Sequence, residues 1–404
     1  MVTVSPPSGT PAELESVGYN DCTWDKPWNL PRGQLTCSER MPTAALDPGR
    51  AIPWSVGPPL ALGGLVAEDP LTGRQFSLEG LLQDRMRADG LLVVHRGRLI
   101  AEWYGNGMTD HDLHVVHSCS KTLTSMAIGI AISEQKLDPT QLMSTYVDEL
   151  ASMPAWNDVT LQNVLDMATG IATDEHYEDP TSMYWRYADA VGYYGFTSAE
   201  QAIGCLAFVS TELTTRVCAS GEVFNYASYL TNLLPIALER AYGIPACEFY
   251  ETRIYQHIGA ESQALINVDS LGAPIVEGQV NLTLRDFARW AYLLVNDGKS
   301  LDGTPVVPRE WQVEAFRTSA ARRRAFERSD YAEAMPGGEY HNQAWLLNSN
   351  ESILAMLGIH GQYAYIDLPR ELMIVGLSSF PDQANPLMIA TLQEIWTRIT
   401  EAVA

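Results

Sequence analysis

The sequence predicts an α/β (α+β) protein in which helices flank an antiparallel sheet and a mostly helical lobe is inserted between the strands. The stretch GLLVVHRGRLIAEWYGNG holds two β-rich runs around Arg96-Gly97, which is a hairpin signal. Helical-looking runs fill the middle of the chain, and strand-like runs such as AYIDLP and LMIVGLSS follow Ala344. The first and last strands can therefore share one sheet, and the cleft beside the inserted lobe is a common place for a ligand site.

The predicted domains follow from this order of elements. A chain of 404 residues is long for one simple core, so it forms one large mixed domain or two lobes that share a cleft. Residues 1–60 are rich in Pro, Gly, Trp and polar residues without a sustained period, so we expect an N-terminal extension packed on the fold. Residues 61–120 and 280–404 are assigned to the sheet domain and residues 121–279 to the helical domain.

Several helices can be placed from their apolar spacing and their caps. After Lys121 the apolar residues follow a helical period until Leu137-Asp138-Pro139 ends it, so Ser118 opens a helix. The run YLTNLLPIALERAYG predicts another helix, whereas DEHYEDPTSMYWRYADAVGYYGF is predicted to be an irregular, aromatic loop that covers a pocket. Thr283-Leu284-Arg285-Asp286 resembles a capping box with Asp in place of Glu.

Composition and charge exclude several classes of partner. The formal net charge of −23 repels nucleic acid phosphates and anionic lipid alike, so we expect neither a nucleic acid nor a membrane partner. The chain shows no apolar run of about 18 residues and no signal-like start. Six cysteines without a Cys-x-x-Cys pair indicate reduced thiols and a cytoplasmic protein, at positions 22, 37, 119, 205, 218 and 247.

Ser118 and Lys121 form the first candidate catalytic pair. Residues i and i+3 share a helix face, so the Lys121 amine can reach the Ser118 hydroxyl. A serine becomes a nucleophile when a base takes its proton, and a lysine desolvated in a cleft can be that base because desolvation lowers its pKa. Only four residues of the chain are lysine, which gives the position of Lys121 more weight. The alternative is that Ser118 is a helix N-cap and Lys121 is exposed.

Two further features bear on this pair. Ser133 and Lys136 repeat the same spacing near the carboxyl end of the predicted helix, where the helix dipole has the wrong sign for an alkoxide, so this copy is an internal control. Tyr226, in EVFNYASYL, can relay a proton to a leaving group or act as a base if cations lower its pKa. Taken alone, Tyr226 is better explained as a buried ring with a satisfied hydroxyl.

These motifs together resemble a known superfamily. Ser118-x-x-Lys121, Tyr226-Ala227-Ser228 and Gly358-Ile359-His360-Gly361-Gln362 follow the order and approximate spacing of the serine β-lactamase-like superfamily of class C β-lactamases, DD-peptidases and family VIII esterases. Within it, the sequence is most similar to the 6-aminohexanoate-dimer hydrolases, the nylon-oligomer-degrading branch. The segments GIHGQYAYIDLP, IVGLSSFPD and LTLRDFARW strengthen the match, which covers roughly residues 80 to 400.

The resemblance implies a serine hydrolase that cleaves small amides or esters through an acyl-serine intermediate, without a cofactor or metal. Ser118 would be the acylated residue, Lys121 its proton acceptor and Tyr226 the phenol that shuttles a proton to the leaving group. Which of Lys121 and Tyr226 is the base in each step stays open. The backbone N–H groups of Ser118 and Ile359 would form the oxyanion hole.

Further residues are expected around the substrate. Ser228 matches a polar residue beside the tyrosine, and Gly358 would let its strand approach the substrate closely. His360 either contacts the substrate or holds the turn of its strand. A pocket lined by the aromatic residues Tyr177, Tyr193 and Trp345 would suit a neutral or aromatic amide or ester, and dimers would suit the resemblance.

The sequence also departs from the pattern of its relatives. Met356-Leu357-Gly358 occupies the strand where true β-lactamases carry a Lys/His-Thr-Gly triad, so β-lactamase activity should be weak. The acidic side chain that favours the amino group of the nylon dimer falls on Ala188, and a lid tyrosine falls on Thr173. Glu277, expected near the rim of the site, would supply the missing negative charge.

Other readings compete with the serine hydrolase. His111, His114 and His117 suggest a metallohydrolase, but in an extended chain His114 points away from the other two and no further ligand follows at zinc-like spacing. Cys119 lacks a neighbour to activate it, and no Gly-x-Ser-x-Gly elbow is present. A different class is an acyl-binding protein that is acylated once or never, which steady product formation would exclude.

Overall fold

The computed structural model describes residues 4–5, 23–193, 202–348 and 352–404. Its main element is an antiparallel sheet of seven strands in the order β10-β11-β12-β13-β14-β5-β6. The strands of this sheet are β5 (Ala88–His95), β6 (Arg98–Tyr104), β10 (Glu339–His341), β11 (Ala344–Asn348), β12 (Ile353–Gly358), β13 (Gln362–Asp367) and β14 (Leu372–Ser378). Because β14 pairs with β5, the amino-terminal and carboxy-terminal parts of the chain share one sheet, as predicted.

The predicted hairpin is confirmed by the pairing of β5 with β6. Arg96 and Gly97 form its two-residue turn, and both have positive φ angles of 50° and 71°. Positive φ at both central residues is the mark of a type I′ turn, whose twist matches that of the flanking strands. The local sequence therefore determines the register of this strand pair.

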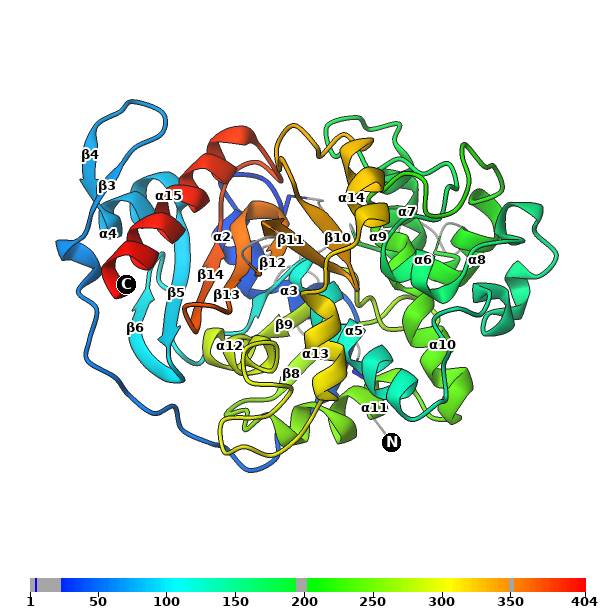
Figure 1. Ribbon diagram of the computed structural model, residues 1–404, viewed down its shortest axis with the longest axis horizontal. Coiled ribbons are helices and arrows are strands. Elements are labelled where there is room, and N and C mark those ends of the chain that lie inside the picture. The colour runs from blue at the N-terminus through cyan, green and yellow to red at the C-terminus, as the bar shows by residue number, and fades with distance from the viewer. Residues whose placement is uncertain (1–3, 6–22, 194–201, 349–351) are drawn as a thin grey trace.

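The seven-stranded sheet is buried on both faces. Leu91 and Val93 of β5 join a cluster with the C-terminal helix α15 (Pro386–Val403), whereas Leu92 and Val94 join the main core on the opposite face. This alternation follows from the period of two in a strand. Helices α5 (Cys119–Ser133) and α12 (Leu284–Tyr292) cover the main-core face, and Figure 1 shows α15 crossing the other face.

A second sheet has the strand order β1-β2-β8-β9-β7, with β1 (Val4–Ser5), β2 (Thr43–Leu46), β7 (His114–Val115), β8 (Ala264–Asn267) and β9 (Val280–Leu282). The segments that form this sheet cross the predicted domain boundaries. The predicted extension contributes a paired strand, β2, and the predicted helical domain contributes β8. β8 and β9 pair with each other, so the predicted boundary at residue 280 falls between two paired strands.

The inserted lobe is mainly helical and lies to one side of the seven-stranded sheet (green in Figure 1). Its helices are α6 (Leu161–Leu165), α7 (Met183–Val191), α8 (Gly204–Glu212), α9 (Ser228–Thr231), α10 (Leu233–Tyr242) and α11 (Ala246–Arg253). Helix α7 lies inside the aromatic stretch that was predicted to be irregular, so that prediction was wrong for residues 183–191. Its apolar rings, including Tyr184 and Tyr187, are buried in the core and stabilise the helix.

The remaining elements are short and lie around these layers. They are α2 (Leu30–Leu35), α3 (Cys37–Arg40), α4 (Leu78–Leu81), α13 (Arg309–Ala315), α14 (Ala320–Glu327), the small sheet of β3 (Val66–Glu68) and β4 (Gln75–Ser77), and single turns of other helix types at 62–64, 82–86, 143–145, 148–150, 154–156, 255–257 and 359–361. Among the described residues, no helix combines the length and apolar character needed to cross a bilayer.

The predicted capping box at the start of α12 is half formed. The Thr283 side chain accepts a hydrogen bond from the Asp286 N–H at 3.2 Å. The Asp286 carboxylate, however, accepts from the N–H groups of Glu261 and Ser262, at 2.9 Å each. The Asp286 carboxylate therefore binds the distant residues Glu261 and Ser262, whereas in a complete capping box it would accept from the backbone N–H of Thr283.

Candidate active site

Ser118 lies at the junction of β7 and α5. It occupies the N-cap position of α5, yet its φ and ψ of −62° and −9° are helical and its side chain caps no N–H. The hydroxyl instead accepts a hydrogen bond from Lys121 Nζ at 2.8 Å. The N-cap reading of Ser118 therefore fits its position in the chain but not its hydrogen bonding.

Lys121 is held in the interior and is 1% exposed. Its Nζ donates to Ser118 Oγ and, at 2.6 Å, to the carbonyl oxygen of Glu277. Burial lowers the pKa of this lysine to about 8, although the carboxylates of Glu175 and Glu277 act in the opposite direction. The uncharged amine, which is the form that can accept the serine proton, is therefore within reach near neutral pH.

Tyr226 completes this group of polar side chains. Its ring lies 5.1 Å from Lys121 Nζ and stacks on the Trp345 ring at 5.3 Å. Burial is the main cause that raises the pKa of Tyr226 well above its usual value, while its hydrogen bond with Ser118 lowers it. The phenol is thus neutral at physiological pH, which suits a proton relay and disfavours Tyr226 as the base, one of the two alternatives that the sequence left open.

Strand pairing and a glycine bring the polypeptide segments of the site together. β7 pairs with β9, so Ser118 just after β7 lies near Glu277 just before β9. At the end of β12, a Cβ on Gly358 would lie 2.9 Å from the carbonyl oxygen of Val116. Gly358 was expected to admit the substrate, but its small size is first required by this approach to the chain beside Ser118.

A small cavity of about 20 Å³ lies against Ser118. Four of the six residues predicted to bind substrate border it, namely Ser228, Tyr177, Tyr193 and Glu277, together with Trp24, His117, Tyr184, Gly278, Gln279 and Ile359. Ser118 and Ile359, the two predicted oxyanion-hole residues, therefore meet at one cavity. In the described part of the chain, neither of their backbone N–H groups donates a hydrogen bond to another residue.

Trp345 and His360 lie outside the wall of this cavity. Trp345 packs behind Tyr226 within an aromatic cluster, and 6% of it is exposed. His360 is fully buried and its Nδ1 lies 2.8 Å from the Phe380 carbonyl oxygen, which fixes the turn after β12. This geometry is the structural alternative that the sequence left open for His360, and substrate contact by either residue stays a prediction.

Glu277 lies inside the site and not at its rim, because only 1% of the residue is exposed. Its Oε1 accepts a hydrogen bond from the Tyr187 hydroxyl at 3.0 Å, and its backbone N–H donates to Asn232 Oδ1 at 3.2 Å. Burial raises the pKa of Glu277 to about 7, and Lys121 opposes this shift. Ala188, on which the resemblance placed an acidic side chain of the nylon-dimer branch, is buried on α7 and offers no charge.

Glu175 is a residue that the sequence reasoning missed. Its Oε1 accepts hydrogen bonds from the hydroxyls of Ser228 and Tyr177, both at 2.6 Å, and its Oε2 accepts from the Ser228 N–H. It thereby ties the segment after Tyr226 to the cavity wall. The sequence signal was only an acidic residue in an aromatic stretch, which carries no motif. Thr173, the predicted lid position, accepts a hydrogen bond from Asn225 at 2.6 Å.

The three histidines that suggested a metal site do not share a ligand position. His114 Nε2 lies 3.1 Å from Asp89, His117 Nε2 lies 2.7 Å from Gln34, and the side chain of His111 is 86% exposed. Within the described ranges, no three His, Cys, Asp or Glu residues form a group that could hold a metal ion. Cys119 is fully buried, and burial raises the pKa of its thiol, which disfavours a thiolate nucleophile.

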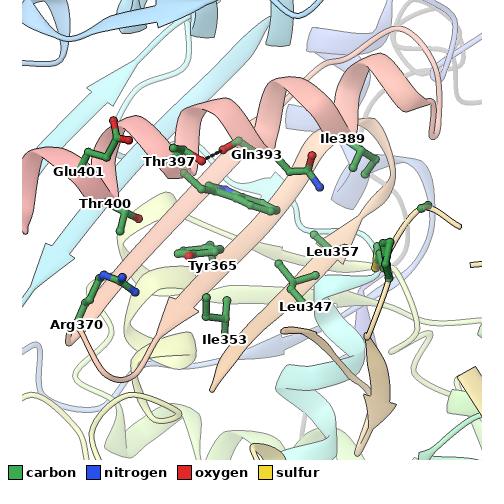
Figure 2. A pocket seen from close by; sticks show the side chains of 14 residues that line it. Leu347, Ile353, Leu357, Tyr365, Arg370, Ile389, Gln393, Thr397, Thr400 and Glu401 are labelled. Carbon is green, nitrogen blue, oxygen red and sulfur yellow. Dashed lines mark hydrogen bonds between the residues drawn. The ribbon is translucent and has the colours of Figure 1, made fainter. Parts of the chain in front are cut away.

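A larger pocket of about 520 Å³ lies elsewhere, between α15 and the sheet. Figure 2 shows α15 above the strands, with Tyr365, Leu347 and Leu357 beneath it. This face of the sheet is opposite to the one covered by α5, and none of the residues that line the pocket is a predicted site residue. Size therefore does not locate the active site in this molecule.

The comparisons agree with the geometry. Residues 77–391 match the family model described as Beta-lactamase, so the chain belongs to this family. It is a serine hydrolase that acts on amide or ester bonds. This chain is 31% identical over 346 residues to the 6-aminohexanoate-dimer hydrolase of Paenarthrobacter ureafaciens. The aligned region covers 85% of this chain and 84% of that protein.

Solved structures show the same fold. A Bacillus anthracis protein provisionally named a 6-aminohexanoate-dimer hydrolase superposes with a TM-score of 0.84 at 21% identity and covers 98% of both chains. EstCE1, a hydrolase with promiscuous acyltransferase activity, superposes with a TM-score of 0.61 at 15% identity and covers 79% of this chain and 97% of its own. At these sequence identities, the structural similarity shows the fold alone.

Proposed function

We propose that this protein hydrolyses small linear amides of the 6-aminohexanoate type through an acyl intermediate on Ser118. The observation that carries the proposal is the 2.8 Å hydrogen bond from buried Lys121 Nζ to a serine hydroxyl that caps no helix. Activity on the 6-aminohexanoate dimer is suggested by the name of the relative that is 31% identical.

In the proposed acylation, the Ser118 oxygen attacks the amide carbon and passes its proton to Lys121. Two backbone N–H groups, from Ser118 and Ile359, would stabilise the oxyanion. Tyr226, as a neutral phenol, would donate its proton to the departing amine and take a proton from Lys121. The bond from carbon to nitrogen breaks, and the amine leaves protonated.

The proposed substrate contacts follow from the cavity wall. Ser228, Tyr177 and Tyr193 border the cavity beside Ser118, and Glu277 adds a carboxylate to the same wall. His360 contacts the ring of His117, which borders the cavity, and Trp345 stacks on Tyr226. A carboxylesterase is the second candidate, because the aromatic wall would also accept a neutral ester. A binding protein that is acylated without turnover is the third.

The first test is intact-protein mass after treatment with a fluorophosphonate serine probe. Wild type and Ser133→Ala should each gain one adduct, and Ser118→Ala should gain none. Ser133 is the matched control because it also stands three residues before a lysine, Lys136, but is exposed at the end of α5. No adduct on folded wild type would overturn the proposal.

The second test distinguishes the three candidates. Wild type is incubated with the linear 6-aminohexanoate dimer and, separately, with a p-nitrophenyl ester. Steady product formation from the amide supports the amidase. Turnover of the ester alone supports a carboxylesterase, and a single burst without turnover supports an acyl-binding protein.

We also propose a cytoplasmic protein whose partners are small molecules, with a homodimer as its assembly. The net charge of −23 opposes contact with nucleic acid or anionic lipid. Five described cysteines are free thiols, which is common in a reducing compartment: Cys37, Cys119, Cys205, Cys218 and Cys247. Light scattering of the purified protein would test the dimer.

A further inference from the structure

One oxygen of the Glu277 carboxylate is buried without a protein partner. Glu277 Oε1 is hydrogen-bonded to Tyr187, but Oε2 receives no hydrogen bond from any described residue. An unsatisfied buried carboxylate oxygen costs free energy, so a native structure retains one where something else uses it. The acylation proposed above transfers no proton to or from Glu277.

The space beside this residue has the size of a water molecule. Glu277 and Ser118 both border the cavity of about 20 Å³, and a water needs roughly 10–15 Å³ on the same measure. Among the other polar side chains of the wall, Ser228 and Tyr177 donate their hydroxyls to Glu175, whereas Glu277 Oε2 has no partner among the described residues. Glu277 Oε2 is therefore an available acceptor for a water molecule in this cavity.

The residues around Glu277 hold it in place. Asn232, between α9 and α10, accepts hydrogen bonds from the N–H groups of Val276 and Glu277 at 3.0 and 3.2 Å and donates to the Tyr187 hydroxyl. Lys121 binds the Glu277 carbonyl oxygen. The carboxylate is thus oriented from its backbone and from one of its oxygens, while the other oxygen remains available.

We propose that Glu277 is the general base that activates the hydrolytic water in deacylation, an inference that rests on the proposed function. The water oxygen attacks the acyl carbon, and one water proton passes to Glu277 Oε2. The tetrahedral intermediate collapses, the bond from carbon to Ser118 Oγ breaks, and Oγ takes a proton from Lys121, whose neutral amine receives the proton held by Glu277. The product acid leaves with the second water proton, and Lys121 and Glu277 return to their starting states.

The charges around Glu277 are compatible with this role. The ionisable groups that act on it are Lys121 on α5, Tyr187 on α7 and Glu175 in the loop before α7. With a pKa raised to about 7, Glu277 is basic enough to accept a proton and is still ionised in part at neutral pH.

The test separates acylation from deacylation with p-nitrophenyl butyrate. Acylation releases p-nitrophenol, and deacylation is followed by quenched intact-protein mass. Glu277→Gln should give a burst of one equivalent, then turnover slowed by about 10²- to 10⁴-fold, with the butyryl adduct accumulating on Ser118. Glu333→Gln, an exposed glutamate in the loop after α14, should match wild type.

Hydroxylamine provides a second measurement. It is small and attacks an ester without a general base, so it should restore turnover of acylated Glu277→Gln and have little effect on wild type. A folded variant that accumulates the adduct but is not rescued by hydroxylamine would overturn the proposal, because water activation would then not be the step that it has lost.

Other outcomes would also overturn it. A raised KM without adduct accumulation would make Glu277 a substrate contact, and equal slowing of both steps would make it a support for Lys121. If wild type forms no adduct on Ser118, both the proposed function and this inference are wrong. If wild type forms the adduct but Glu277→Gln does not accumulate it, only the inference is wrong.

Discussion

The same spacing of serine and lysine occurs at both ends of helix α5, and the two copies have different surroundings. At the first end, Lys121 is 1% exposed and its Nζ donates to Ser118 Oγ and to the Glu277 carbonyl oxygen. At the second end, Ser133 is the last residue of the helix, Lys136 lies beyond it, both are exposed, and Lys136 Nζ lies over the Tyr242 ring at 5.8 Å. The helix brings Ser118 and Lys121 to one face, and burial makes Lys121 a base.

The largest expected effect is the loss of the lysine at the first end. Lys121→Met should lower kcat/KM for ester hydrolysis by about 10⁴-fold or more, because the serine then has no base within hydrogen-bond distance. Lys136→Met should leave kcat/KM within about twofold of wild type. Steady-state kinetics of the two variants measures the difference, and similar losses in both would remove the distinction between the two ends.

The next largest effect concerns the proton relay. Tyr226→Phe should slow amide hydrolysis by about 10²- to 10⁴-fold, because a departing amine needs a proton. A p-nitrophenyl ester should be slowed much less, since p-nitrophenolate leaves without protonation. The ratio of amide to ester rates is the measurement, and an unchanged ratio would assign Tyr226 to packing alone.

The third prediction uses the lowered pKa of Lys121. The uncharged amine is the active form in acylation, so kcat/KM should rise about tenfold per pH unit below a midpoint near 8 and level off above it. The direction is set by burial, which disfavours the ammonium. A pH profile of ester hydrolysis checks this, and a rate that falls as the pH rises towards 8 would contradict the assigned base.

The smallest effect compares two residues at helix N-caps. Thr283→Ala should reduce the free energy of unfolding by about 1 kcal/mol, because the Thr283 side chain caps α12. Ser118→Ala should cost no capping energy, since its hydroxyl caps nothing. Denaturant unfolding of both variants gives the comparison, and an equal loss at Ser118 would restore its reading as a structural cap.

Much of the fold could be predicted because its signals are local. The hairpin needed only two strand-like runs around Arg96-Gly97, and the strands after Ala344 needed only their apolar residues. The missed elements depended on distant partners. Helix α7 forms within an aromatic stretch whose rings find a core, and the Asp286 carboxylate is occupied by Glu261 and Ser262.

In the candidate site, too, local signals could be predicted from the sequence and contacts between distant residues could not. The order of Ser118-x-x-Lys121, Tyr226-Ala227-Ser228 and the 358–362 motif is a property of the sequence, and it carried the resemblance that predicted a serine hydrolase. Glu175 was missed because its role depends on its contact with Ser228, which is 53 residues away in the chain. Glu277 was expected at the rim because its burial could not be read from its neighbours in sequence.

The sequence by itself determined which chemical groups are present, the helix that begins after Ser118 and the class of reaction. Only the tertiary structure decided how those groups ionise and which of two identical spacings is buried. The physical reason is that spacing along a helix is local, whereas desolvation and charge depend on every segment that packs around a side chain. The pKa of Lys121, lowered to about 8 by burial, is the clearest case.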